Sequence, residues 1–401
     1  MLITSLLIIT GIYFLANLSL VIIWLRNPIQ SSLIVSPRLL GEVPKGLTVI
    51  IPVRNEAENI LHLLLDLEKQ TYSRHNYEVI VADDDSTDDT LKIVQEFQKN
   101  TNINLIINQL PPKTNNTSPK KRAIDSSINL ASGQLIITTD GDCRVGEKWL
   151  ESIANFQTKT GAYLVSCTVT FFEAQRHKDS KAQKSTILFP NIDLFFTNIQ
   201  IIEFASLIGS GACAMFVQKP NMCNGANLTY LKSVFYEVNG FAGNEDLASG
   251  DDEFLMHKIA AKYPDKVRFL KSQDTIVETN AHTNWRSFYN QRKRWASKWQ
   301  HYNNWPTTAL AVFVFIANLV IPLSFGFWLF DFISAKSLVL VLSLKFLAEF
   351  IFLSLVISFL RKKSLIWLIP FVQIIYPLYV VFFGLVAQKQ GEYVWKGRKL
   401  K

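Results

Sequence analysis

Hydrophobic residues are distributed unevenly along the chain, and this distribution predicts separate membrane and soluble parts. Residues 1–25 carry no charged side chain, and three further apolar runs occupy residues 307–330, 337–360 and 365–387. Each run reaches the roughly 20 residues that a helix needs to cross a bilayer. No basic segment precedes the first run and no small-residue cleavage site follows it, so we expect an uncleaved anchor. The other three predict a C-terminal membrane bundle over residues 306–388.

The membrane runs contain a few polar and helix-disturbing residues. Lys345 and Glu349 are four residues apart on one helical face, and we expect them to pair. The pair either neutralises two charges inside the bundle or belongs to a substrate path. Pro322, Pro370 and Pro377 each disturb a helix, so the last run is either spanning, re-entrant or interfacial.

Between the membrane runs, the period of the hydrophobic pattern alternates between that of strands and that of helices. Short apolar runs at residues 46–53, 77–82, 102–108 and 134–139 are typical of buried strands. Amphipathic runs at residues 58–69, 90–98 and 120–130 are typical of helices. The alternation predicts an α/β domain over residues 46–283, with a mixed, largely parallel sheet and helices on both faces. Residues 26–45, which contain three prolines, are expected to form a linker.

Polar residues follow three of the predicted strands. They are Pro52, Arg54 and Glu56 after the first, Asp83 and Asp84 after the second, and Asp140 and Asp142 after the fourth. Ligands of parallel sheets bind beyond the carboxyl ends of the strands, so we expect these residues to face one crevice. Asp84 can accept hydrogen bonds from a nucleobase or a ribose, although helix capping is an alternative for such acids.

Asp140 and Asp142 flank a glycine and can hold one divalent cation, Mg²⁺ or Mn²⁺, while a diphosphate supplies further oxygens. The alternative is a tight turn, because Asp-Gly is a common turn dipeptide. Lys120 begins a predicted helix and either reaches a phosphate or is solvated within a basic cluster.

Composition narrows the function classes. The net charge is +8 with 18% charged residues, and basic residues gather beside the apolar runs, at residues 361–363 and in the tail, residues 389–401. They indicate contact with anionic lipid and not with nucleic acid. The four cysteines and six histidines match no zinc or redox spacing, and phosphate-loop and dinucleotide fingerprints are missing. We expect reduced thiols in a cytoplasmic domain.

Membrane sidedness poses a problem for these runs. If all four runs cross the bilayer and the middle domain is cytoplasmic, the basic tail falls on the outer side, against the positive-inside bias. Either one run does not span or the bias is overruled.

Five motifs in one order, VIIPVRNEAENI, VIVADDDSTDDT, KKRAIDSSINLASGQLIITTDGD, GDDEF and QRKRW, resemble the membrane-embedded family 2 glycosyltransferases. The resemblance covers residues 46–295 and implies an inverting enzyme with a GT-A fold. It implies that Asp83 and Asp84 contact the nucleoside and that Asp140 and Asp142 hold the metal and the diphosphate. Two motifs depart from the family: Asp85 stands where many members have glycine, and the base motif reads Gly-Asp-Asp-Glu.

The resemblance implies that an acid of the Gly-Asp-Asp-Glu motif is the catalytic base. The alignment favours Asp252 and leaves Asp251 open, while a plain helix start capped by Ser249 is the alternative. Residues 284–305 predict an amphipathic interface helix that carries Gln291, Arg294 and Trp295 of the Gln-x-x-Arg-Trp motif on one face. Arg294 is suited to diphosphate oxygens and Trp295 to the acceptor end.

These observations predict a metal-assisted, inverting transfer of a sugar from a nucleotide sugar to an acceptor hydroxyl. We expect the donor to be a UDP-sugar. The acceptor is expected to be a lipid, polyisoprenoid or glycan that is delivered from the membrane. A non-catalytic binding or transport protein and a processive polysaccharide synthase are the alternatives. Every catalytic motif is present, which disfavours a non-catalytic protein. Four apolar runs are few for a polymer channel, which disfavours a processive synthase. We expect an integral protein of a bacterial inner membrane with its catalytic domain on the cytoplasmic side.

Overall fold

The computed structural model describes residues 2–30, 46–112, 118–173, 192–245, 247, 249–297, 305–386, 393–395 and 398–400. The chain divides into two compact units. Unit 1 comprises Met1–Arg26, Phe171–Ser210 and Ala281–Gly391, and unit 2 comprises Asn27–Thr170, Gly211–Asn280 and Glu392–Lys401. Each unit is described by itself. Most of the linker at 26–45, part of the helix at 284–305 and most of the tail at 389–401 lie outside the described residues.

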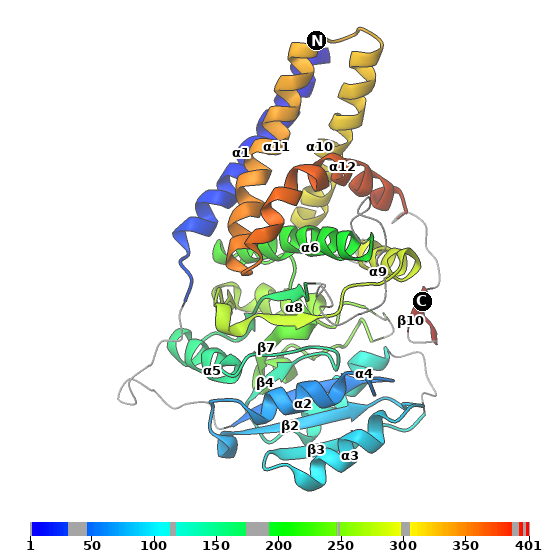
Figure 1. Ribbon diagram of the computed structural model, residues 1–401. Helices are drawn as coiled ribbons and strands as arrows, with labels where there is room; N and C mark the ends of the chain where they lie inside the picture. The colour runs from blue at the N-terminus through cyan, green and yellow to red at the C-terminus, as the bar shows by residue number, and fades with distance from the viewer. Residues whose placement is uncertain are drawn as a thin grey trace. The chain divides into compact units, whose positions relative to one another are not determined.

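Unit 2 contains a seven-stranded sheet in the order β3-β2-β1-β4-β7-β5-β8 (Figure 1). Strands β3, β2, β1 and β4 are mutually parallel, β5 is parallel to β8, and β7 runs antiparallel to β4 and β5. The strands are β1 (Leu47–Val53), β2 (Tyr77–Asp83), β3 (Asn104–Gln109), β4 (Leu135–Thr138), β5 (Leu164–Ser166), β7 (Leu228–Leu231) and β8 (Val267–Phe269). The predicted mixed, largely parallel α/β sheet is confirmed.

The reversal of β7 determines which loops lie at the carboxyl edge of the sheet. Leu228, the first residue of β7, pairs with Thr138, the last residue of β4. The short helix η3 (Gly225–Asn227), which precedes β7, therefore lies beside the residues that follow β4. The central strands are apolar and inaccessible to solvent, as at Val49, Ile50 and Ile80, and burial of each such side chain stabilises the fold by about 1.5–3 kcal/mol.

Helices connect the strands of unit 2, and α4 packs against β1 and β2. They are α2 (Ile60–Glu68), α3 (Thr90–Asn100), α4 (Pro119–Leu130), α5 (Trp149–Thr160), α7 (Lys232–Glu237) and α8 (Glu253–Lys262), with the 3-10 turns η2 (Arg74–Asn76), η4 (Pro264–Lys266) and η5 (Gln273–Thr275). Two short strands, β6 (Val169–Phe171) and β9 (Val277–Thr279), form a separate ribbon. A second ribbon joins β10 (Tyr393–Trp395) to β11 (Arg398–Leu400). The sequence pattern did not predict either ribbon.

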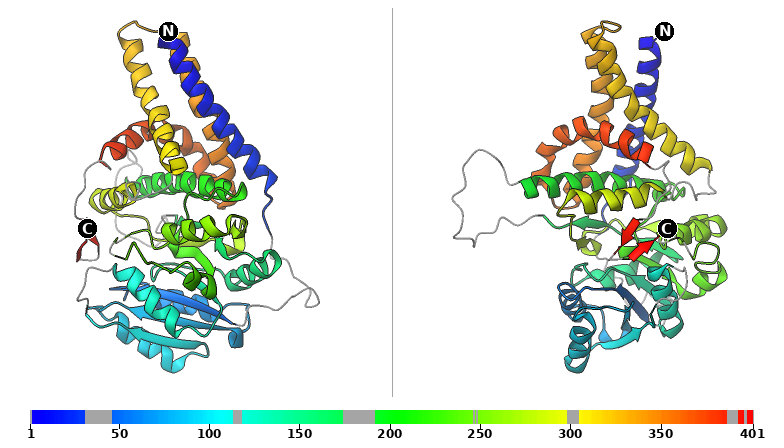
Figure 2. Two further views of the ribbon diagram at one scale, coloured as in Figure 1. Left: turned by 180° about the vertical axis from the view of Figure 1, so that it is seen from behind. Right: turned by 90° about the vertical axis from the view of Figure 1, so that its right-hand side faces the viewer.

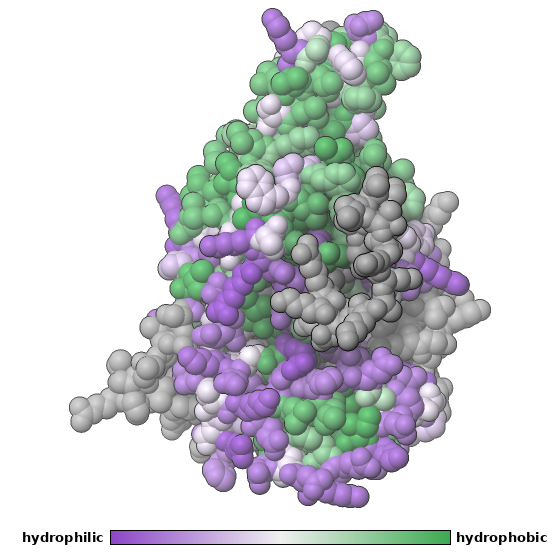
Figure 3. All heavy atoms as spheres, viewed as in Figure 1, coloured by the Kyte–Doolittle hydropathy of each residue, from purple (hydrophilic) through white to green (hydrophobic). Residues whose placement is uncertain are grey.

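Unit 1 is built from long apolar helices and one shorter amphipathic helix, α9 (Figure 2). They are α1 (Leu2–Arg26), α6 (Ile192–Phe216, of which residues 192–210 belong to this unit), α9 (Trp285–Ser297), α10 (Trp305–Leu329), α11 (Ala335–Phe359) and α12 (Ile369–Val386), with η7 (Lys363–Leu368) before α12. The outward side chains of α10 and α11 are largely hydrophobic, and Val312, Leu340 and Leu347 are exposed (Figure 3). Such a surface fits a lipid environment.

Within the part of the chain that the structure describes, five helices are long and apolar enough to cross a membrane: α1, most of α6, α10, α11, and η7 with α12. The sequence pattern predicted four apolar runs and did not include α6, which carries the charged residues Asp193 and Glu203. The most apolar part of α6 is 61% buried against 28% in α1 and α10. In Figures 1 and 2, α6 and α9 lie across the direction of α1, α10 and α11. The burial and this direction favour packing of α6 within the protein.

The expected pair of Lys345 and Glu349 is present and buried inside the bundle. Three helices contribute to it, because Glu349 Oε1 also accepts a hydrogen bond from Tyr13 of α1 and Glu349 Oε2 accepts one from Gln373 Nε2 of α12 at 3.3 Å. The Lys345 ammonium also lies 4.5 Å from the centre of the Tyr13 ring. The predicted pairing is confirmed, and the neighbouring donors satisfy the carboxylate.

Candidate active site

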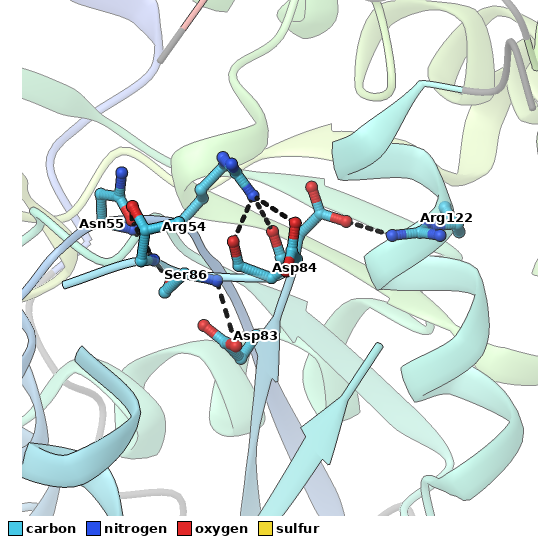
Figure 4. A network of polar contacts seen from close by, with 8 residues as sticks. Arg54, Asn55, Asp83, Asp84, Ser86 and Arg122 are labelled. Atoms are coloured by element: carbon cyan, nitrogen blue, oxygen red, sulfur yellow. Dashed lines mark hydrogen bonds and ion pairs between the residues drawn. The ribbon is translucent and has the colours of Figure 1, made fainter. Parts of the chain in front are cut away.

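The residues that follow β1 and β2 form a connected polar network at the carboxyl edge of the sheet (Figure 4). Arg54 Nη1 donates to the carbonyl oxygen of Asp84 at 2.5 Å and to that of Asp85, and it lies 3.5 Å from Asp85 Oδ2. Asn55 Oδ1 accepts from the backbone N–H of Thr87 at 2.8 Å. Arg54 therefore holds the loop after β2 in place by binding its backbone.

Asp85 has a φ of 60°. This left-handed conformation is open to glycine and, among other residues, most readily to Asn and Asp. The departure from glycine in the second motif is thus accommodated without a change of backbone.

Asp83 and Asp84 are both buried, with 2% and 3% exposure. Asp84 Oδ1 pairs with the Arg122 guanidinium from α4. Asp83 Oδ2 accepts from the Ser86 N–H at 3.3 Å, while Asp83 Oδ1 is buried and accepts no hydrogen bond from the described residues. A buried carboxylate oxygen without a donor is costly, and a ligand N–H or hydroxyl can supply that donor.

The residues after β4 occupy the next position along the same edge. A β-carbon at Gly141 would lie 2.9 Å from Val53 Cγ1, so the close approach of β1 requires glycine here. Asp142 Oδ2 accepts from the Thr279 hydroxyl of β9 at 3.0 Å. Asp140 is partly open, with 38% of its side chain exposed.

Asp140 and Asp142 offer the hard oxygen donors that Mg²⁺ and Mn²⁺ prefer. Burial, followed by the charges of Asp140 and Asp142, raises the pKa of the Cys143 thiol well above its usual range. Among the described residues no group of three His, Cys, Asp or Glu is placed to enclose a metal. The acids therefore suit an ion that a diphosphate also ligates, which is the usual arrangement for Mg²⁺.

Lys120, at the start of α4, connects the metal motif to the proposed base motif. Its Nζ lies 2.6 Å from Asp140 Oδ1 and 3.5 Å from Asp251 Oδ2. Burial alone would lower the pKa of Lys120, but the charges of Asp140 and Asp251 outweigh burial and raise it, so the ammonium stays charged. Lys120 is therefore ion-paired, and the expectation of a solvated lysine is wrong.

Asp252 is the N-cap residue of α8, and Ser249 is not, which corrects the alternative interpretation of this motif. Asp252 Oδ1 accepts from the Glu253 N–H at 2.7 Å, and Oδ2 accepts from the Gly225 N–H at 2.9 Å. A β-carbon at Gly225 would lie 2.9 Å from Asp251 Oδ2 and 3.4 Å from Lys120 Nζ. Glycine at the start of η3 thus allows Lys120 and both acids to converge.

Two sequence candidates, Glu56 and Pro52, and the core residue Asn227 have mainly structural contacts. Asn227 is buried, accepts from Trp149 Nε1 at 3.0 Å and donates to two carbonyl oxygens at 2.8 Å, so its amide is satisfied within the core. Glu56 is buried and accepts from Asn59 Nδ2 at 2.9 Å. Pro52 pairs with Ala82 within the sheet.

In unit 1, α9 carries Gln291, Arg294 and Trp295. Gln291 Oε1 accepts a hydrogen bond from Arg292, and Trp295 stacks on Phe204 of α6 with 5.7 Å between the ring centroids. His282 precedes α9 and forms a hydrogen bond with Gln291. Burial lowers the pKa of His282, and the charges of Arg292 and Arg294 lower it further. The hydrogen bond to Gln291 raises the pKa but does not outweigh burial, so the imidazole stays neutral at pH 7. Trp299 and Tyr302, also expected on this helix, lie outside the described residues.

Sequence reasoning missed four residues with contacts to the candidate side chains. Arg122 pairs with Asp84, Thr279 bonds Asp142, Gly225 bonds Asp252, and Arg292 bonds Gln291. Only Arg122 and Arg292 could have been found from the sequence, because both lie inside the motifs that resemble the family. Thr279 and Gly225 come from distant segments that the sheet brings together.

Comparison with known proteins gives a consistent family and fold. Residues 48–225 match the model of the family described as glycosyl transferase family 2. Glycosyltransferase AglE of Haloferax volcanii is 30% identical over 217 residues, which cover 54% of this chain and 62% of AglE. The poly(ribitol-phosphate) β-N-acetylglucosaminyltransferase TarS of Staphylococcus aureus is 34% identical over 109 residues, 27% of this chain and 18% of TarS. The matches thus span less than two thirds of these relatives.

The structure resembles mannosyltransferase PcManGT from Pyrobaculum calidifontis, solved in complex with GDP-Man and Mn²⁺. The two share 15% identity with a TM-score of 0.54, and the likeness covers 94% of this chain and 96% of PcManGT. At this identity the likeness establishes the fold alone, which is the GT-A type expected from the motifs. Residues 48–225 therefore match a glycosyl transferase family 2 domain, and their fold is of the GT-A type.

Proposed function

We propose that the protein is an inverting glycosyltransferase that moves a sugar from a UDP-sugar to a hydroxyl of a lipid, polyisoprenoid or other membrane-delivered acceptor. The observation that carries the proposal is the convergence of Asp140, Asp251 and Asp252 around Lys120 and Gly225. These residues come from the ends of separate segments, and their charges are not balanced, because two acids share one lysine. A net negative, partly open cluster of this kind suits a divalent cation with a nucleotide diphosphate.

In the proposed reaction, Asp252 accepts the proton of the acceptor hydroxyl as its oxygen forms a bond to the anomeric carbon. The bond from that carbon to the diphosphate breaks at the same time, so the anomeric configuration inverts. The backbone N–H groups of Gly225 and Glu253 fix the Asp252 carboxylate in one orientation. Lys120 is placed to neutralise charge on the departing diphosphate, and a cation on Asp140 and Asp142 would act as a Lewis acid for the same oxygens.

The donor-binding set extends to the residues after β1 and β2 and to α9. We assign Asp83, Asp84 and Arg54 to the nucleoside end. None of the described residues donates a hydrogen bond to Asp83 Oδ1, and Arg54 binds the backbone of the loop that carries Asp84. Gln291, Arg294 and Trp295 are assigned to the diphosphate and acceptor ends on the basis of their motif.

The decisive experiment measures release of nucleoside diphosphate by the purified full chain in detergent with Mn²⁺ and a panel of UDP-glucose, UDP-GlcNAc, UDP-galactose and GDP-mannose. We expect metal-dependent hydrolysis of a UDP-sugar. Asp252→Asn should abolish it while leaving the affinity for UDP within about twofold, because the change removes a base and keeps a helix cap.

Asp251→Asn should retain measurable activity, and Asp265→Asn on η4 is the matched control with wild-type rates. Turnover of GDP-mannose alone would overturn the UDP assignment. Full activity of Asp252→Asn would overturn the base, and no hydrolysis of any donor, even with added lipid extract, would overturn the enzyme. Comparison of lipid extracts from cells with and without the gene by mass spectrometry would then identify the acceptor.

The packing within unit 1 also supports a membrane topology with three crossings. Trp24, near the end of α1, packs against Phe352 and Phe359, near the end of α11. Leu6, near the start of α1, packs in one cluster with Leu338 of α11. Helices α1 and α11 therefore run in the same direction, and α10 connects to α11 with the opposite direction.

The last helix, α12, turns back instead of crossing. Gln373 reaches Glu349 in the middle of α11, but Tyr379 bonds Glu203 of α6 at 2.8 Å and Phe383 packs against Phe288 of α9. Because α6 lies against Val356 at the end of α11, the second half of α12 returns to that end. Pro377 lies inside the helix at this bend.

This topology places the tail on the side where α1 and α11 end, together with Arg361 and Lys362, and it satisfies the positive-inside bias. Alkaline phosphatase fused after Lys401 should be inactive in a bacterial inner membrane, since that enzyme folds only outside the cytoplasm. The same fusion after Phe332, between α10 and α11, should be active and serves as the control. Activity of the fusion after Lys401 would show that α12 crosses.

A further inference from the structure

Arg292 is the most deeply buried charged residue of α9, although its motif assigns it no role. Its side chain is 2% exposed, and that of its partner Glu203 on α6 is 6% exposed. Arg292 Nη2 lies 2.5 Å from Glu203 Oε2 and Arg292 Nε lies 3.1 Å from Glu203 Oε1, which is a two-pronged pair. This geometry requires the planar fork of arginine, and lysine cannot reproduce it.

The guanidinium also contacts both neighbouring residues of the motif. Its Nη1 donates to Gln291 Oε1, and its central carbon lies 4.3 Å from the centre of the Trp295 ring. On another side the same carbon lies 4.6 Å from the Phe288 ring. One buried group therefore restricts the side-chain orientations of Gln291 and Trp295 simultaneously.

A third helix completes the arrangement. The Tyr379 hydroxyl of α12 donates to Glu203 Oε1 at 2.8 Å. Glu203 thus has donors from two helices, and the pair with Arg292 is electrically neutral. A neutral, fully hydrogen-bonded pair of this kind rarely improves stability over apolar residues of the same size, so a role in specifying geometry accounts better for its presence.

We propose that Arg292 is a positioning residue, held by Glu203 and Tyr379, that fixes the Gln291 amide and the Trp295 indole in the orientations needed to contact the nucleotide sugar and the acceptor. Because Gln291 Oε1 accepts a hydrogen bond from Arg292, the amide is oriented with its N–H₂ group away from that contact. The inference deepens the proposed function and rests on its assignment of Gln291.

The pair can be removed without leaving a buried charge. The double variant Glu203→Leu/Arg292→Met replaces both members by apolar side chains of similar size. The start of α9 keeps a separate attachment to α6, because Gln200 Nε2 donates to the His282 carbonyl at 2.9 Å and Gln200 Oε1 accepts from the His282 N–H at 3.0 Å. Phe196 also stays packed on Phe288.

The test is a double-mutant cycle on hydrolysis of the best donor in the panel described above. We expect the paired variant to lower kcat about tenfold to a hundredfold, as for a misplaced contact group, with a smaller change in KM. Gln291→Ala should lower kcat in the wild type but have less than about a twofold effect in the paired variant, because the amide is already misoriented there. Lys345→Met/Glu349→Leu, a second neutral pair in unit 1, is the matched control and should keep wild-type kinetics.

Each other outcome is decisive. If the effects of Gln291→Ala and of the paired variant multiply, Arg292 does not act through Gln291 and the inference is wrong while the proposed function stands. If the paired variant has wild-type kcat, the inference is also wrong. If Gln291→Ala has no effect in the wild type, the assignment of Gln291 in the proposed function fails and the inference fails with it.

Discussion

Two regions of the molecule gather charged side chains, and they differ in how far the protein satisfies those charges itself. At the carboxyl edge of the sheet in unit 2, Lys120 is shared by Asp140 and Asp251, and 38% of the Asp140 side chain is exposed. Inside unit 1, Lys345 pairs with Glu349 alone, and the lysine is 1% exposed. The first cluster has surplus negative charge and open oxygens, whereas the second is neutral and enclosed.

The comparison teaches that the count of charged residues does not identify a ligand site, but their balance and saturation do. A neutral, saturated cluster has no donor or acceptor left for a ligand, so its members should affect stability or, as proposed for Arg292 and Glu203, affect turnover only by positioning a neighbouring side chain. An unbalanced, open cluster should affect turnover and have little influence on stability. The following predictions test this division.

The largest effect is expected in the bundle. Lys345→Met leaves Glu349 buried without its cation, which should lower the free energy of unfolding by about 3–5 kcal/mol. Thermal denaturation in detergent measures the loss. The paired change Lys345→Met/Glu349→Leu should restore stability to near the wild-type value. A single variant as stable as the wild type would mean that the pair is solvated and that the contrast does not hold.

A slightly smaller effect, and on a different property, is expected at the sheet edge. Asp140→Asn removes a cation ligand and should reduce metal-dependent turnover about 10²–10³-fold, which corresponds to roughly 2.7–4 kcal/mol. Its effect on stability should stay below about 1 kcal/mol, because a partly exposed ion pair contributes little. Parallel measurements of donor hydrolysis and melting temperature separate the two. Loss of stability without loss of turnover would reverse the assignment.

The smallest effect concerns a saturated carboxylate within unit 2. Glu78, at the opposite edge of the sheet, accepts from the Thr48 hydroxyl at 2.7 Å and from the Ser132 N–H at 2.6 Å. Burial alone would raise the pKa of Glu78, but these hydrogen bonds outweigh burial and lower it below the ordinary 4.5. Glu78→Gln should therefore cost about 1–3 kcal/mol of stability at pH 7 without changing donor affinity.

The pH dependence of this contribution follows from the sign of the shift. A lowered pKa in the folded state stabilises the protein fully above the pKa of the unfolded state, and this stabilisation is lost as pH falls through the folded value. The stability difference between wild type and Glu78→Gln should thus shrink below about pH 4.5. Denaturant unfolding across the acid range measures it, and a difference that is independent of pH would contradict the assignment.

Much of unit 2 could be predicted because its strands are uniformly apolar and end in sharp polar breaks. The predicted runs at residues 77–82 and 120–130 differ by only one residue from β2 and α4. The reversal of β7 could not be predicted, since the four residues Leu228–Leu231 have no pattern that encodes direction. The contact between Gly225 and Asp252 depends on this reversal, so it could not be predicted either.

The sequence was less informative about unit 1. Hydropathy identified the apolar segments, but it cannot distinguish a helix that crosses the membrane from one that turns back, which is the course that we propose for α12. The spacing of Gln291, Arg294 and Trp295 predicted a common face, yet the strongest contacts of α9 belong to Arg292, whose partner Glu203 lies 89 positions earlier. Partners at such separations are set by packing and leave no local signal.

The antiparallel direction of β7 has a consequence for how the chain tolerates change in length. The connection that enters β7 lies at the edge that carries Asp140, while the connection that leaves it, at Lys232, lies at the opposite edge beside the start of β4. Insertions between residues 217 and 224 would thus displace Gly225 and abolish activity. Insertions of similar size just after Leu231 would extend the far side and spare it.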